Sequence, residues 1–304
     1  MQDESIASAE INYADSVSES ERDNIQRSIA TLVERSRKRT ARERALAAQR
    51  TQIRSAAKEA YGKLLEPATP LPNIALDEGL SEPPDWQAEI PGTPALTEQT
   101  AREISELRFG NATRIFGPPF HYDWRWSNGG GTYAVTNDAS KAGSAGSWAA
   151  VKKDDAWADV HAGVGVVIST ETVNATGPVL VMGRSLSHSY NSWGVHASIN
   201  NGDGTSEGRV ELTVMENGNF LTAASTRIWR CRLSDSELDS HYDPDSGYAL
   251  DTTPEVVWTM HPGRSYTLNI GAWVYVECHD GWWGTDSSAS GLLQLDINLL
   301  TLFK

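Results

Sequence analysis

A run of residues without proline or glycine, 18–61, limits what this chain of 304 residues can fold into. Ser18, followed three residues later by Glu21, resembles a capping box, which satisfies free backbone N–H groups at a helix start. A helix of about 45 residues is about 68 Å long. A helix of that length cannot bury itself within a small domain, so we expect it to need a partner surface.

Seven-residue spacing of apolar positions along this helix suggests a coiled-coil assembly surface. Arg39 and Glu43 interrupt the spacing as a polar layer, with Ser36 and Arg50 beside it, and such a layer sets register or oligomeric state. We expect a homo-oligomer; the alternatives are packing on another protein or on the chain's own body, and a solitary solvated helix. The candidate assembly residues are Ile25, Ile29, Leu32, Leu46, Ile53 and Leu64.

Charge is divided unevenly along the chain. The whole chain carries a net charge of −14, yet residues 21–63 hold 12 basic and 5 acidic residues, a local balance of +7, which leaves −21 for the remainder. The basic cluster around 35–44 suits docking onto an acidic surface, nucleic acid or anionic lipid, and equally a solvated helical face. We favour the solvated face. If the basic cluster does dock, we expect its electrostatic partner to be the acidic body of another copy of the chain.

Four segments follow from these patterns: a helical assembly segment over 1–66, a linker over 67–96, a short helix over 97–110 and a β-sandwich over 111–304. Residues 1 to about 17 are polar and are expected to be frayed. Seven prolines between Pro67 and Pro94 indicate an extended linker. Thr97 as N-cap and Gly110 as stop bound the short helix.

From about Thr113 the apolar pattern has a period of two. Aromatic residues alternate with polar ones over 120–126, and the longest alternation covers 266–278. Turn sequences rich in Asn, Gly and Asp separate the strand candidates. The chain is therefore expected to be mainly β, with an antiparallel, jelly-roll-like sandwich after the long helix. The apolar last strand, 293–299, is placed inside a sheet.

Cysteine and acidic residues offer little metal or redox chemistry. Cys231 and Cys278 share faces with core residues, so two buried thiols are expected rather than a disulfide. No Cys pair or His spacing is typical of zinc, and no cofactor is expected. Asp243 begins a run of oxygen ligands, but Pro254 occupies the twelfth position and excludes an EF-hand. The weak metal candidate is calcium in an irregular loop of Asp239, Asp243, Asp245 and Asp251.

Aromatic residues carry the strongest indication of binding, because exposed flat rings suit sugar stacking or a protein interface. Trp282 and Trp283 are adjacent, so one of them is expected to be exposed. Trp273 and Tyr275 lie on the face opposite the core residues of their strand, and His188 and His196 flank Tyr190 and Trp193. The candidate ligand-binding residues are Trp282, Trp283, Trp273, Tyr275, Trp193 and Tyr190.

Together these features predict a non-enzymatic structural and recognition protein, in which the helix mediates assembly and the sandwich binds a glycan or protein. An attachment or adhesin-like component, a virion or tail component, and a toxin all suit this layout. The alternative is a glycan-acting hydrolase built on the sandwich. A pI near 4.9 argues against nucleic acid. The acidic start at Met1 and the lack of a long apolar run argue against a signal peptide and a membrane span, so we expect a cytoplasmic chain or one released within an assembly.

Overall fold

A computed structural model describes residues 9–61, 112–153, 155–187, 192–197, 202–234, 238–241, 250–280 and 286–304. The strongly alternating segments form strands, and the segment without proline or glycine forms one long helix. The helices and strands are β1 (Glu10–Tyr13), α1 (Glu19–Tyr61), β2 (Ala112–Phe116), β3 (Tyr122–Gly130), β4 (Tyr133–Ser140), β5 (Ser144–Lys152), β6 (Trp157–Ser169), α3 (Thr170–Val173), β7 (Gly177–Ser187), β8 (Ser192–His196), β9 (Asp203–Glu216), β10 (Asn219–Ser234), β11 (Leu238–His241), β12 (Leu250–Thr252), β13 (Glu255–Met260), β14 (Ser265–His279) and β15 (Ser288–Phe303).

Two antiparallel sheets make up the body, which confirms the predicted β-sandwich after a long helix. Sheet A has six strands in the order β1-β3-β6-β14-β9-β10. Sheet B has nine strands and runs β11-β8-β15-β5-β4, with β7 pairing β12, β13 and β15, and β2 pairing β15. Strand β15 pairs with β5 on one side and with β7 and β8 on the other, so the last strand lies inside a sheet as predicted.

Alternating side chains of both sheets form the core between them. In β14, even-numbered residues from Tyr266 to Cys278 are buried there, together with Leu293 and Leu295 of β15. Cys231 and Cys278 are thiols buried in this core, as expected. Burial raises the pKa of Cys278 to about 12, so this thiol stays protonated and unreactive near neutral pH.

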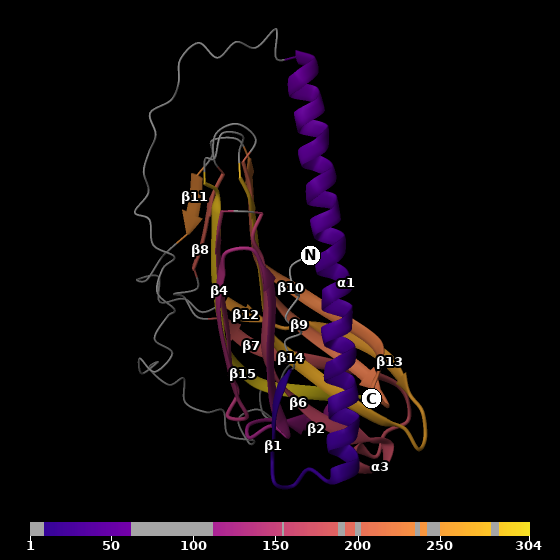
Figure 1. The fold of residues 1–304 in the computed structure, drawn as a ribbon. Coiled ribbons are helices and arrows are strands. Elements are labelled where there is room, and N and C mark those ends of the chain that lie inside the picture. The colour runs from indigo at the N-terminus through magenta and orange to yellow at the C-terminus, as the bar shows by residue number, and fades with distance from the viewer. Residues whose placement is uncertain are drawn as a thin grey trace.

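The outer face of sheet A is covered by α1, which gives the molecule a third layer (Figure 1). Helix α1 contacts β6, β10 and β14. Before the helix, residues Glu10–Tyr13 pair with β3 as strand β1, so the expectation of a frayed start is wrong for these residues. Ser18 precedes the helix, and Glu21 accepts a hydrogen bond from its backbone N–H at 2.8 Å, the half of the predicted capping box that the structure shows.

Only some of the apolar residues at seven-residue spacing on α1 face sheet A. Ile25 and Ile29 are fully buried against the chain's own sheet A, whereas Leu46 is 38% and Ile53 61% exposed. A straight helix with 3.6 residues per turn drifts by about 20° per heptad, so a strict seven-residue row turns gradually away from a flat partner. Figure 1 shows the last turns of α1 standing clear of both sheets.

The linker 67–96, the short helix 97–110 and Leu64 lie outside the described residues. Residues 1–66, expected as an assembly segment, contribute β1 and the first half of α1 to the sandwich body. Strands β4 and β5 were not expected. The Asn-Gly-Gly-Gly sequence at 128–131 is typical of a turn, but its first three residues belong to β3, which ends at Gly130. None of the helical residues that the structure describes forms a segment long and apolar enough to cross a membrane.

Candidate functional site

Strand β6 carries polar side chains on the face that α1 covers. Val160 and Ala162 point into the core between the sheets, so Asp159 and His161 point the other way, beneath the helix. Asp159 is only 1% exposed and His161 is also buried. A carboxylate at this depth must be compensated by hydrogen bonds or a nearby positive charge.

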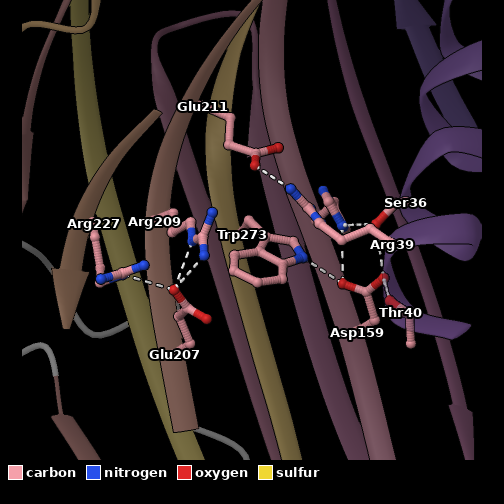
Figure 2. Close-up of polar contacts among 10 residues, drawn as sticks. Ser36, Arg39, Thr40, Asp159, Glu207, Arg209, Glu211, Arg227 and Trp273 are labelled. Atoms are coloured by element: carbon pink, nitrogen blue, oxygen red, sulfur yellow. Dashed lines mark hydrogen bonds and ion pairs between the residues drawn. The ribbon is translucent and has the colours of Figure 1, made fainter. Parts of the chain in front are cut away.

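Asp159 accepts hydrogen bonds from both sides of this interface (Figure 2). From α1, the hydroxyls of Ser36 and Thr40 each lie 2.8 Å from Oδ2. From sheet A, the indole N–H of Trp273 donates to Oδ1, and His161 Nε2 lies 3.0 Å from the same atom. The carboxylate therefore ties the middle of the helix to two strands.

The pKa of Asp159 shows that the anion is well stabilised. Burial alone would raise this pKa, but the charge and hydrogen bond of His161, the charge of Arg39 and the hydroxyl of Ser36 together hold it at about 2. The site thus keeps its carboxylate ionised at any pH near neutrality. Its role here is to hold the helix on the sheet.

Ser36, His161 and Asp159 do not form a nucleophilic relay, although the three residue types are those of a catalytic triad. Both Ser36 Oγ and Asp159 Oδ1 lie 3.0 Å from the same nitrogen, His161 Nε2. A triad needs the serine and the carboxylate on opposite ring nitrogens. In addition, Trp126 stacks on the imidazole with ring centroids 4.0 Å apart, which closes one face of the ring.

Arginines of α1 lie over aromatic rings of sheet A. The guanidinium of Arg35 is 3.2 Å from the ring centroid of Phe220, and that of Arg44 is 4.8 Å from Trp157. Arg39 lies 4.2 Å from Trp273 and also pairs with Glu211. Part of the basic cluster, expected as a solvated face, therefore docks onto the chain's own sheet through cation–π contacts and ion pairs.

A second charged group lies on the same face of sheet A, on the other side of Trp273 (Figure 2). Glu207 is buried, and its carboxylate pairs with Arg209 and with Arg227 at 2.8 Å; Arg230 is 3.8 Å away. Arg209 also lies over Trp273, 4.9 Å from the ring centroid. The indole is thus held between charged groups of β9 and α1.

A cavity of about 230 Å³ lies between α1 and this face of sheet A. Its charged lining residues are Arg35, Arg39, Arg209 and Glu211, and its aromatic ones include Trp273 and Phe220. Gly271 also lines it, and a side chain at this position of β14 would collide with the backbone carbonyl of Ala162 in β6. Arg35, Ala223 and Ser225 are exposed, which places the mouth between α1 and the edge strand β10.

Several residues proposed from the sequence lie elsewhere. Trp273 and Tyr275 do lie on the face opposite the core, and both are only 3% exposed because α1 covers this region; Trp273 lines the cavity beneath the helix. Trp193 is partly buried against the core from β8. Asp239 and Asp251 lie in β11 and β12, and within the described ranges no group of His, Cys, Asp and Glu is arranged to hold a metal. Outside the described residues lie Trp282, Trp283, Tyr190, His188, Asp243 and Asp245.

Sequence reasoning missed most of the polar site. Asp159, His161 and Thr213 alternate with buried aliphatic residues, a pattern typical of any strand with one solvated face. The usable signal was the polar layer of α1: Ser36 and Arg39 interrupt an apolar row at the level where the helix meets the buried carboxylate.

Comparisons with known proteins add little to this geometry. No family model matches the chain, and no curated protein matches it. Among solved structures, the glycoside hydrolase domain of Endo-D from Streptococcus pneumoniae is similar at 12% identity with a TM-score of 0.21. The match covers 59% of this chain and 22% of that chain, and a similarity this weak transfers neither a fold nor an activity.

Proposed function

We propose that this is a non-enzymatic structural and recognition protein, in which α1 mediates assembly into a homo-oligomer and the β-sandwich presents a binding site for a glycan or protein partner. One observation supports the assembly role: Leu46 and Ile53, seven residues apart on α1, are 38% and 61% exposed, so the chain's own sheet does not cover their side chains. Apolar residues at this spacing form the contact row of helices that associate. Several sandwiches joined in this way would turn weak single-site binding into strong avidity.

The alternative, a glycan-acting hydrolase, receives less support from the same site. Glycoside hydrolysis uses two carboxyl groups on either side of the scissile bond. Among the described residues that line the cavity beneath α1, Glu211 is the one carboxylate, and Arg39 pairs with it. This lining suits binding better than acid–base chemistry.

Replacing Leu46 and Ile53 together by Glu tests the assembly role. We expect the unaltered chain to give a mass in light scattering that is a multiple of 33.2 kDa, and the double variant to dissociate at least about 100-fold more readily, because charges would enter an apolar contact row. The fold should persist, because both side chains are exposed.

The matched control is Ala48→Glu with Gln52→Glu, which adds the same charge to exposed positions on the other flank of the same helix segment. This control should leave the mass unchanged. A monomeric unaltered chain, or equal dissociation of both double variants, would rule out assembly through this row.

A further inference from the structure

The cavity between α1 and sheet A combines a small volume with an excess of positive charge. Its volume of about 230 Å³ lies below the ~300–1,000 Å³ usual for drug-sized ligands, which limits an occupant to a small molecule. Arg35, Arg39 and Arg209 line it against one carboxylate, Glu211. Arg209 and Arg39 already pair with carboxylates. Among the described residues that line the cavity, Arg35 is therefore the arginine without a carboxylate in contact, and its guanidinium lies over Phe220.

The electrostatics of Arg35 point the same way. Burial lowers its pKa, and the like charge of Arg39 lowers it further, with Glu211 opposing the shift. The two guanidinium groups, four residues apart on α1, therefore repel each other beside the cavity. A negative group between them would remove this repulsion.

Hydrogen-bond donors in the lining are also unused. Thr213 is 7% exposed, and its hydroxyl has no partner among the described residues. The same holds for two buried N–H groups of the lining, Nε of Arg39 and Nε1 of Trp124. Buried donors without a partner are costly, so three of them around one cavity are suited to a ligand that brings oxygen acceptors.

We propose that this cavity binds a small ligand carrying an oxyanion, a carboxylate or a phosphate group, with Arg35 supplying the main charge and Thr213 a hydrogen bond. Arginine forks match both kinds of group. The site does not depend on assembly through α1, because every residue in it belongs to one chain.

Calorimetric titration of the full chain tests this proposal, with glucuronate, inorganic phosphate and neutral glucose as probes. We expect glucuronate or phosphate to bind once per chain at millimolar concentration or below, and glucose at least about tenfold more weakly, since glucose differs from glucuronate by lacking the carboxylate. Preference for glucuronate assigns the ligand to the carboxylates, and preference for phosphate assigns it to the phosphates. No saturable binding of either anion, or equal binding of glucose, would overturn the proposal.

Two variants separate the site from the fold. Thr213→Val keeps the shape of the side chain and removes an unpartnered hydroxyl, so the melting temperature without ligand should stay the same or rise, while anion binding weakens about tenfold. Arg35→Gln should weaken binding at least as much, because it removes the main positive charge of the site. The fold should persist in this variant, since the Arg35 side chain is exposed. Arg227→Gln on the same face, outside the cavity, is the control and should bind as before. Unchanged binding by both cavity variants would contradict the assignment.

Discussion

Replacing Asp159 by Asn is expected to destabilise the protein by about 3–5 kcal/mol, the usual cost of removing one partner from a buried charged pair. Four groups donate to or pair with this carboxylate: the hydroxyls of Ser36 and Thr40, the indole N–H of Trp273 and the ring of His161. An amide has one acceptor oxygen and would direct its NH₂ group at donors. Urea unfolding measures the loss, and Asp138→Asn, at a half-exposed carboxylate paired with Arg125, should change stability by less than about 0.5 kcal/mol.

The pH dependence of the same variant gives the prediction a second signature. The pKa of Asp159 falls from about 3.8 to about 2 on folding, so its contribution is present above the unfolded value and disappears as pH falls through about 2. We expect about 2 kcal/mol of stability to be lost by the unaltered protein in this window because of Asp159. Asp159→Asn should lack this part of the acid transition. An identical pH profile for the two proteins would show that Asp159 is not stabilised in its charged form.

Ile29→Ala is expected to destabilise the protein by about 3 kcal/mol, within the range found when a buried aliphatic side chain is truncated. Ile29 is fully buried between α1 and sheet A, in a cluster with Ile25, Tyr122 and Trp124. The matched control is Ile53→Ala, the same substitution on the same helix at a side chain that is 61% exposed, which should stay within about 0.5 kcal/mol.

Thermal and urea unfolding would measure both alanine variants. If Ile29→Ala cost no more than Ile53→Ala, the first half of α1 would not be held on the chain's own sandwich. A stability loss for Ile29→Ala with an unchanged oligomeric mass would separate the docking half of the helix from its assembly half.

Much of the fold could be predicted from the sequence because period-two alternation reports directly on burial in strands. The even-numbered residues of β14 and the position of β15 inside a sheet are examples. Strand β1 was missed because four polar-flanked residues contain too few alternations to indicate a strand, and their pairing with β3 is set by tertiary contact.

The candidate site was less predictable because it exists only where helix α1 packs on the outer face of sheet A. Trp273 and Tyr275 were placed on the correct face, yet nothing local indicates that the chain's own helix buries them. The heptad spacing of α1 indicated a partner helix. On a straight helix, however, residues at seven-residue spacing turn gradually away from a flat sheet. Ile25 is therefore buried near the start of α1, whereas Ile53 near its end is exposed.

Hydrogen exchange along α1, followed at several protein concentrations, tests most directly the claim that one half of the helix docks on its own sandwich and the other half serves assembly. Residues 24–47 should be protected at every concentration, because their cover belongs to the same chain. Residues 48–61 should exchange quickly in dilute protein and become protected only at concentrations where the mass shows an oligomer. Fast exchange over both halves in dilute protein, or protection of 48–61 that does not change with concentration, would contradict this division of the helix.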